Sequence, residues 1–368
     1  MKVGIDLSPL EKGHRVRGIG SYTRNLFAWL NKIGPKSGLT VEELNPQSKY
    51  DLIHYPYFDL FFISLPWQPQ TKIVVTIHDV IPLLFPNHYP PGIKGQIKFL
   101  IQKILLKQTK AVITDSQTSK NDIIKYLEYP AEKIFPIQLG IDSGFKQIKD
   151  LKFLASVQKK YHLPEKFVLY VGDINYNKNV PALVKACEKV AIPLVIVGKQ
   201  ATEKNIDRNH PENQDLVWLQ DYQKHLTSHL SPLILTGYIP QGDLPIIYNL
   251  ASVYCQPSLA EGFGLPGLEA MVCSCPVVCS NIPVLKEIYN DAAIYFDPYN
   301  INDIAQKIND LCSHDLNHEN RKRLILKGVK QIKKFSWEKC AEETLEIYMK
   351  IVREDPSRAK LGQDNTLL

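Results

Sequence analysis

The most informative stretch of the sequence is a glycine-rich turn between a short apolar run and a predicted helix. The run Val253–Gln256 predicts a buried strand, and Gly262 and Gly264 follow it, where they let the backbone turn tightly and approach a ligand closely. Pro266 favours the first turn of a helix directly afterwards. Because the first N–H groups of a helix lack partners and its dipole is positive there, the sequence predicts a phosphate-type anion site at this turn.

Two glutamates stand on either side of the turn. Glu261 precedes it, and Glu269 lies at the end of the first helical turn or in the second, so both carboxylates can accept hydrogen bonds from sugar hydroxyls. An ordinary strand-to-helix turn with two solvated glutamates is the alternative, and these residues alone leave it open.

Lys178 and His78 are further candidates because each follows a predicted strand. Lys178 comes shortly after Phe167–Val171, at a strand end where a cation can pair with a phosphate-type anion. His78 ends the run Lys72–Ile77 and suits a polar contact to a ligand rather than general-base work. A solvated lysine and a structural histidine are the alternatives.

Two weaker signals follow other strands. The segment Arg17–Tyr22 contains Gly18 and Gly20 and predicts a glycine-rich loop between the first strand and a helix whose amino end faces an anion. Tyr238 and Ile239 come after another apolar run, where they would line either a ligand or an ordinary core loop.

Short apolar runs alternate with amphipathic runs of helix length along the chain. Several are continuous Val, Ile and Leu, which is typical of parallel strands covered on both faces. The sequence therefore predicts an α/β fold with open parallel sheets. We expect strands at Val3–Leu7, Leu52–Tyr55, Ile73–Ile77, Ala111–Thr114, Phe167–Val171, Leu194–Val197, Leu233–Thr236, Val253–Gln256, Val277–Cys279 and Ala293–Phe296.

The pattern restarts after a lysine-rich polar stretch, which places a domain boundary near residues 142–164. With 368 residues, we expect two domains, 1–150 and 151–335, with a cleft between them. Residues 336–368 are expected to form a final helix, which crosses back to the N-terminal domain, and a polar tail. Ser336 would cap that helix, and Trp337, Ala341, Leu345 and Tyr348 would form its buried face.

Composition excludes several classes of protein. Lys plus Arg is 44 and Asp plus Glu is 38, and the resulting net charge of +6 is too mild to indicate a nucleic-acid partner. The sequence has no apolar run of about 18 residues and begins directly as a strand, so we expect a cytoplasmic protein without a transmembrane helix or secretory signal. Seven cysteines, with Cys273, Cys275 and Cys279 closely spaced, are interpreted as buried free thiols, with a zinc site as the alternative.

One basic and apolar stretch, residues 92–110, has two interpretations. It contains five lysines among Ile and Leu residues and predicts an amphipathic helix. Such a helix either packs as an ordinary surface helix on its own domain or makes a peripheral contact with anionic lipid at the inner face of the membrane.

The stretch from Glu261 to Glu269, E-G-F-G-L-P-G-L-E, resembles the Glu-x7-Glu motif of retaining glycosyltransferases of family 4 (glycosyl transferases group 1). Flanking residues agree, and the resemblance extends over nearly the whole chain. It implies the GT-B fold, in which an N-terminal Rossmann-like acceptor domain and a C-terminal Rossmann-like donor domain face each other across a cleft.

The resemblance also implies roles for the candidates. Glu269 would hold the nucleotide ribose, and Glu261 would bind hydroxyls of the donor sugar. Lys178 would contact the diphosphate, and His78 would lie at the donor sugar. The remaining donor contacts would come from Phe263, Gly264, Leu265, Tyr238, Ile239, Gly18 and Gly20.

Two features qualify the implied chemistry. Many relatives carry a basic residue where this chain has Asp173, so the expected pair of cations at the diphosphate is weakened. The sequence contains no Asp-x-Asp, the motif with which glycosyltransferases of another fold hold a divalent cation, and we expect neither a metal nor another cofactor.

The leading hypothesis is a retaining transferase that moves a hexose from a nucleotide diphosphate sugar to a glycan or lipid-linked acceptor in polysaccharide or glycolipid synthesis. The stretch from His78 to Pro86 resembles mannosyltransferases of surface-polysaccharide pathways, which favours GDP-mannose over a UDP-sugar. One alternative is a catalytically weak or inactive GT-B regulatory subunit that binds nucleotide sugar. The acidic Asp173 supports this alternative. A Rossmann oxidoreductase is disfavoured because Gly18–Thr23 lacks the third glycine or alanine of its motif.

Overall fold

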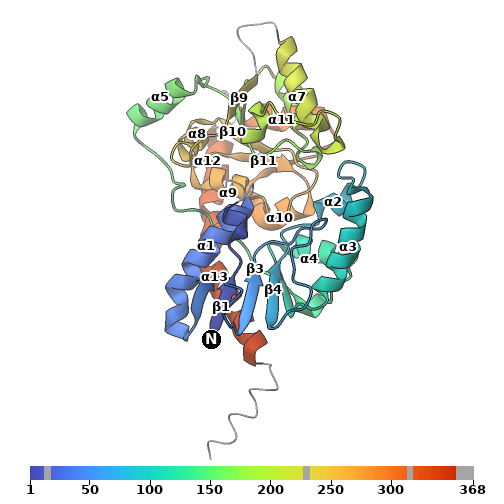
Figure 1. Cartoon of the computed structure of the whole chain (residues 1–368). Helices are drawn as coiled ribbons and strands as arrows, with labels where there is room; N and C mark the ends of the chain where they lie inside the picture. Colours follow the sequence, from blue (N-terminus) through green and yellow to red (C-terminus); the bar gives the residue numbers. More distant parts are fainter. Residues whose placement is uncertain (12–17, 227–232, 313–317, 354–368) are drawn as a thin grey trace, which may run out of the picture. The chain divides into compact units, whose positions relative to one another are not determined.

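The computed structural model describes residues 1–11, 18–226, 233–312 and 318–353. The chain forms two compact α/β units, each built on a six-stranded parallel sheet (Figure 1). The first unit comprises Met1–Val80, Pro91–Gly140 and the chain from Phe335 onward, and the second comprises Ile81–Pro90 and Ile141–Lys334. The predicted α/β class with two Rossmann-like units is confirmed.

The sheet of the first unit has the strand order β2-β1-β3-β4-β5-β6. The chain therefore winds outward from β1 to β2 and then continues on the other side of β1, so that the winding reverses between β1 and β3. The strands are β1 Lys2–Ile5, β2 Thr40–Glu43, β3 Leu52–Tyr55, β4 Lys72–Thr76, β5 Ala111–Thr114 and β6 Ile134–Pro136, and the helices are α1 Gly18–Ile33, α3 Gly92–Leu106, α4 Gln117–Leu127 and α13 Trp337–Arg353.

The sheet of the second unit has the order β12-β11-β10-β7-β8-β9, and its winding reverses between β7 and β10. Its strands are β7 Val168–Val171, β8 Leu194–Val197, β9 Leu233–Gly237, β10 Val253–Gln256, β11 Val277–Ser280 and β12 Ile294–Phe296. Its helices are α2 Ile81–Leu84, α5 Leu151–Lys160, α6 Val180–Lys189, α7 Gln214–His225, α8 Leu244–Leu250, α9 Leu265–Val272, α10 Pro283–Tyr289, α11 Ile301–Cys312 and α12 His318–Gln331.

The ten expected strands are present within one or two residues of their predicted ends, and β2 and β6 were not expected. Both lie at edges of the first sheet. β2 is polar on one side, and β6 has only three residues and ends in Pro136, so neither gives a continuous apolar run.

The final helix α13 agrees with its prediction. The Ser336 hydroxyl accepts a hydrogen bond from the Lys339 amide at 3.1 Å, and the four residues predicted for its apolar face are buried. The helix packs against α1 and β4 of the first unit. Gly140 meets its start so closely that an added Cβ would lie 2.1 Å from the Trp337 nitrogen, which excludes any larger residue there.

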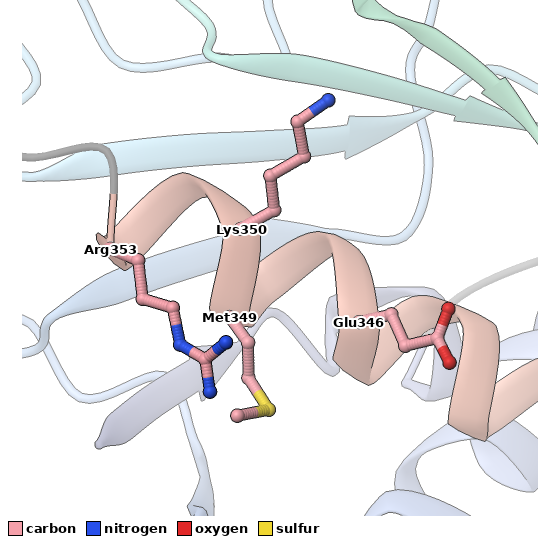
Figure 2. A pocket seen from close by; sticks show the side chains of 4 residues that line it. All are labelled: Glu346, Met349, Lys350 and Arg353. Carbon is pink, nitrogen blue, oxygen red and sulfur yellow. The ribbon is translucent and has the colours of Figure 1, made fainter.

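A surface pocket of about 390 Å³ lies against the last turns of α13. Figure 2 shows its lining side chains, Glu346, Met349, Lys350 and Arg353, which all come from this one helix. None of the residues that the sequence predicts for the functional site lines this pocket.

Candidate active site

The sheet of the second unit brings two predicted site residues together. Ligands of open parallel sheets bind beyond the carboxyl ends of the strands, where the winding reverses. Here that point lies between β7 and β10, which pair in parallel. The loop after β7 supplies Lys178, and the loop after β10 supplies Glu261.

These two residues form a mostly buried ion pair. Lys178 Nζ donates to Glu261 Oε1 at 2.8 Å and to Oε2 at 2.7 Å. Ser258 Oγ and Gln256 Nε2 also donate to Glu261 Oε1, at 2.7 Å and 3.0 Å. The side chain of Lys178 is 24% exposed and that of Glu261 is 10% exposed, so the interpretation of both as solvated surface residues is wrong.

Hydrogen bonds also join the two loops directly. The Leu259 amide donates to the Asn177 carbonyl at 2.7 Å, and Asn177 Nδ2 donates to the Ala260 carbonyl at 3.1 Å. Asn179 Nδ2 donates to the Pro257 carbonyl at 3.1 Å. Asn179 has a left-handed backbone with φ 53°, a conformation that asparagine adopts more readily than most residues. The loops therefore hold Lys178 and Glu261 at fixed positions.

The glycine-rich turn before α9 is confirmed. Gly264 has φ 99°, and Cβ atoms added at Gly264 and Gly267 would lie 2.7 Å and 2.2 Å from the Tyr289 hydroxyl. That hydroxyl lies within hydrogen-bonding distance of Gln256 Oε1 (2.5 Å) and of the Gly264 carbonyl. Pro266 lies in the first turn of α9. Glu261 belongs to the turn that leads into α9. The amino end of this helix therefore lies near the Lys178–Glu261 pair.

The other residues of this turn and the β9 loop differ in exposure. Phe263 is buried and Leu265 is half-buried. Tyr238 exposes 54% of its surface just after β9, whereas Ile239 is buried in the core. Of these two, only Tyr238 has a side chain accessible for stacking, and Ile239 could offer a ligand only its backbone.

Glu269 lies on α9 and is only partly exposed. Its Oε2 accepts a hydrogen bond from the Tyr248 hydroxyl at 3.0 Å. Desolvation raises the pKa of Glu269 to about 7 and the charge of Asp142 adds to this rise, while the Tyr248 hydrogen bond opposes it. The carboxyl group therefore titrates near neutral pH.

A segment that overlaps the stretch from His78 to Pro86, for which the sequence predicted no contact with Lys178, also holds the Lys178 loop. This strap, Ile81–Pro90, belongs to the second unit although the chain around it belongs to the first. The Tyr89 hydroxyl donates to Asn177 Oδ1 at 2.5 Å and accepts from the Asn177 amide at 3.3 Å. Phe85 and His88 both contact the ring of Tyr176, at centroid distances of 5.4 Å and 3.3 Å.

His78 lies in the first unit, beyond the end of β4. Its Nδ1 is 2.8 Å from Asp115 Oδ2, and its Nε2 is 3.2 Å from the Pro56 carbonyl. Burial lowers the pKa of His78, but the nearby Asp115 carboxylate outweighs it, and the net pKa is raised. Because both neighbours are acceptors, the ring donates from both nitrogens when protonated, which does not suit a general base.

The prediction for the N-terminal glycines is corrected. Gly18 and Gly20 lie in the first turn of α1 and not in a loop before it. An added Cβ at Gly18 would meet no atom within 4 Å, so the fold itself does not require glycine there. The preceding residues, including Arg17, lie outside the described part of the chain.

Sequence reasoning missed the supports of these residues. Gln256, Tyr248 and Tyr289 hold the two glutamates and the turn, and Asn177 with Tyr89 holds the Lys178 loop. One signal was present: Gln256 is a polar residue at the end of an otherwise apolar strand. Tyr248 and Tyr289 gave no such signal, because aromatic residues are ordinary members of a protein core.

All seven cysteines are free and buried, which confirms their interpretation as core thiols. In the part of the chain that the structure describes, no cluster of three or more His, Cys, Asp or Glu side chains is arranged to hold a metal ion. Among the same residues, no helix is both long and apolar enough to cross a membrane.

Both halves of the sequence match known families. Residues 6–145 match Glycosyltransferase Family 4, and residues 155–331 match Glycosyl transferases group 1. The chain is 30% identical to O-antigen chain mannosyltransferase B of Escherichia coli over 285 residues, which are 75% of this chain and 70% of that protein. It is 28% identical to the serotype-specific mannosyltransferase WbdA of Escherichia coli over 79% of this chain, and the match spans only 34% of that longer protein.

The fold agrees with a solved structure. HepE of Anabaena in complex with UDP-glucose superimposes with a TM-score of 0.67 and 16% identity, covering 95% of this chain and 99% of that one. Two matched halves, a relative at 30% identity and two Rossmann-like units lead to one conclusion. The chain belongs to the GT-B glycosyltransferases of group 1 and family 4.

Proposed function

We propose that this glycosyltransferase moves a hexose from a nucleotide diphosphate sugar to a glycan or lipid-linked acceptor in polysaccharide synthesis, with retention of configuration at the transferred carbon. The observation on which this proposal depends is the Lys178–Glu261 pair, held at the β7–β10 strand ends beside the amino end of α9. A cation and a helix amino end at this position suit a diphosphate, and a fixed carboxylate suits sugar hydroxyls.

In the proposed reaction the bond between the sugar C1 and the diphosphate oxygen breaks, and the acceptor oxygen bonds to C1 on the same face. The acceptor's proton leaves with the nucleoside diphosphate. Lys178 and the first amides of α9 stabilise the negative charge on the departing diphosphate, so no metal ion is required. Glu269 accepts hydrogen bonds from the ribose, and Tyr238 packs on the base.

His78 supplies a polar contact to the donor sugar in this proposal. Its Nε2 contact with the Pro56 carbonyl, at 3.2 Å, is longer than its Nδ1 contact with Asp115, at 2.8 Å. A sugar hydroxyl can therefore replace the carbonyl as acceptor while Asp115 keeps the ring in place.

Mannose is the proposed sugar, with GDP-mannose as donor. O-antigen chain mannosyltransferase B and WbdA are both named as mannosyltransferases, which supports this choice. HepE was solved with UDP-glucose, which keeps a UDP-sugar as the second candidate. A cytoplasmic location is part of the proposal, because seven buried free thiols fit a reducing compartment.

A thermal-shift panel of UDP, GDP, ADP and their sugars tests the donor. A ligand that binds only the native state raises the unfolding free energy by about 2.7 kcal/mol at 100 times its dissociation constant. We expect GDP and GDP-mannose to raise the melting temperature most, and product analysis with GDP-mannose and acceptor to show transfer. If no nucleotide changes the melting temperature, the donor site is wrongly assigned.

Asp173 favours a second candidate, a GT-B subunit that binds nucleotide sugar without transferring it. The family resemblance implies a cation at this position, and in this structure Glu261 compensates the charge of Lys178. Binding in the thermal-shift panel with neither transfer nor slow donor hydrolysis would favour this alternative.

A further inference from the structure

Helix α3 of the first unit has one buried and one exposed apolar side. Gln102, Leu105 and Leu106 are buried. On the other side Ile93, Ile97, Leu100 and Ile104 are exposed by 80%, 55%, 62% and 62% of their surfaces. Their spacing of four, three and four residues aligns them in one stripe along the helix. Single exposed apolar residues are ordinary, but a continuous stripe indicates an interaction surface.

An exposed aromatic residue lies in a loop that packs against another side of α3. Phe62 is 63% exposed, and Lys98 Nζ lies 4.4 Å from the centre of its ring. Gln102 Nε2 holds the loop to α3 by donating to the Asp59 carbonyl at 2.6 Å and to Ser64 Oγ at 2.7 Å. We define the apolar face as Ile93, Ile97, Leu100 and Ile104.

The charged side chains of α3 and the residues directly after it are all basic. Residues 92–110 contain five lysines and no aspartate or glutamate. At about 100° per residue, Lys94 and Lys103 lie on opposite flanks of the stripe, roughly 80–100° from Ile93. Lys94, Lys107 and Lys110 are exposed, whereas Lys103 pairs with Glu128 at 3.2 Å. In Figure 1, α3 runs along the margin of its unit with no helix drawn outside it in this view.

This combination fits a lipid surface better than a protein partner. Protein interfaces favour Tyr, Trp and Arg and are depleted in Lys, whereas this face combines aliphatic residues with flanking lysines. At a bilayer, aliphatic side chains enter the boundary between headgroups and acyl chains, and lysine amines reach the phosphates.

We propose that the apolar face docks on the surface of an anionic phospholipid bilayer, with α3 parallel to the membrane plane. The apolar side chains anchor the helix, and the lysines select anionic headgroups. The inference depends on the first unit alone and holds whether or not the donor site transfers mannose.

Co-sedimentation of the full chain with vesicles tests the proposal. One set contains phosphatidylcholine alone, and the other contains equal parts of phosphatidylcholine and phosphatidylglycerol. We expect binding to the anionic set to exceed binding to the neutral set by at least about tenfold and to weaken with salt, since each lysine contributes about fivefold.

Two variants separate the contribution of the apolar side chains from that of the lysines. L100E/I104E places charge in the stripe, and we expect it to lower the partition to anionic vesicles at least about tenfold. K94Q/K98Q keeps the stripe and should lose the preference for anionic lipid. The matched control is L326E, which changes a leucine on α12 that is also 62% exposed, and it should bind like the wild type. Thermal melts verify that all variants fold.

Three outcomes would overturn the proposal. The wild type could fail to bind anionic vesicles, or L100E/I104E could fold and bind them as the wild type does. Sedimentation velocity supplies the third. The apolar face would join two copies of the chain if the wild type were a dimer and L100E/I104E a monomer, while both bound vesicles equally.

Discussion

Lys178 and Glu261 are 83 residues apart in the chain, yet Lys178 Nζ lies 2.8 Å and 2.7 Å from the two carboxylate oxygens of Glu261. The pair exists because β7 and β10 are neighbours in the sheet although they are distant in sequence. In the absence of donor, Glu261 compensates the charge of Lys178 and fixes its direction. Donor binding then needs little reorganisation of Lys178, since it is already ordered.

The first prediction concerns Lys178→Ala. It removes the cation nearest to the proposed diphosphate site, so we expect kcat to fall by about 10²- to 10³-fold, measured as initial rates with the best nucleotide sugar. The control is Lys160→Ala, which breaks the Lys160–Asp243 pair at 2.6 Å on an exposed part of the same unit. It should keep full activity. Equal activity of the two variants would remove Lys178 from the mechanism.

The second prediction concerns Asp173→Arg, which places a positive charge at the position where the family resemblance implies one. The Tyr170 hydroxyl donates to the backbone carbonyl of Asp173 at 2.6 Å, and a side-chain substitution preserves that bond. We expect kcat to rise several-fold, because a second cation further stabilises the departing diphosphate. Asp173→Asn removes the negative charge without adding a positive one and should give a smaller gain. An Asp173→Arg variant with unchanged or lower kcat would contradict the prediction.

The third prediction concerns the pH dependence of stability through Glu269. Its pKa is about 7 in the folded protein, above its ordinary value of 4.5. The folded state therefore binds the proton more tightly, and this contribution to stability is full below pH 4.5 and is lost as the pH rises through 7. Glu269→Gln stays neutral at every pH, so we expect it to be more stable than the wild type at pH 8, by on the order of 2–3 kcal/mol.

Denaturant unfolding at pH 5 and pH 8 measures this difference. The stability gap between Glu269→Gln and the wild type should widen between the two pH values, and a constant gap would show that Glu269 titrates in its ordinary range. Nucleotide binding moves in the opposite direction. If the ionised carboxylate accepts hydrogen bonds from the ribose, binding to the wild type strengthens as the pH rises through 7, and Glu269→Gln loses that dependence.

The sequence predicted the glycine-rich turn before α9 because its signals are local. Glycines, a proline and a glutamate pair within nine residues define the turn before α9, and the Gly264 φ of 99° explains why glycine is required there. The strand before the turn is a buried apolar run. Local pattern and tertiary structure agree at this turn, whereas the binding roles of its residues stay a prediction.

Long-range contacts explain what was missed. The sequence pattern identifies Tyr248 and Tyr289 only as aromatic core residues. The folded structure shows that their hydroxyls bond to Glu269 and to the Gly264 carbonyl. The strap Ile81–Pro90 lies in the chain between two segments of the first unit, so no periodicity assigns it to the second unit. Gly18 and Gly20 indicated a loop because they form a Gly-x-Gly pattern after the first strand, but both lie in the first turn of α1.

The last prediction concerns the strap. The Tyr89 hydroxyl is hydrogen-bonded to Asn177, the neighbour of Lys178, so we interpret Tyr89 as a positioning residue. Tyr89→Phe leaves the buried Asn177 without this partner and should lower the unfolding free energy by about 1–3 kcal/mol. Because a small displacement of Lys178 weakens its contact in the transition state, we also expect kcat to fall about tenfold with little change in KM. Tyr299→Phe, at a tyrosine that is 76% exposed, should change neither quantity. If Tyr89→Phe loses stability at unchanged kcat, the strap supports the fold of the second unit and does not position Lys178.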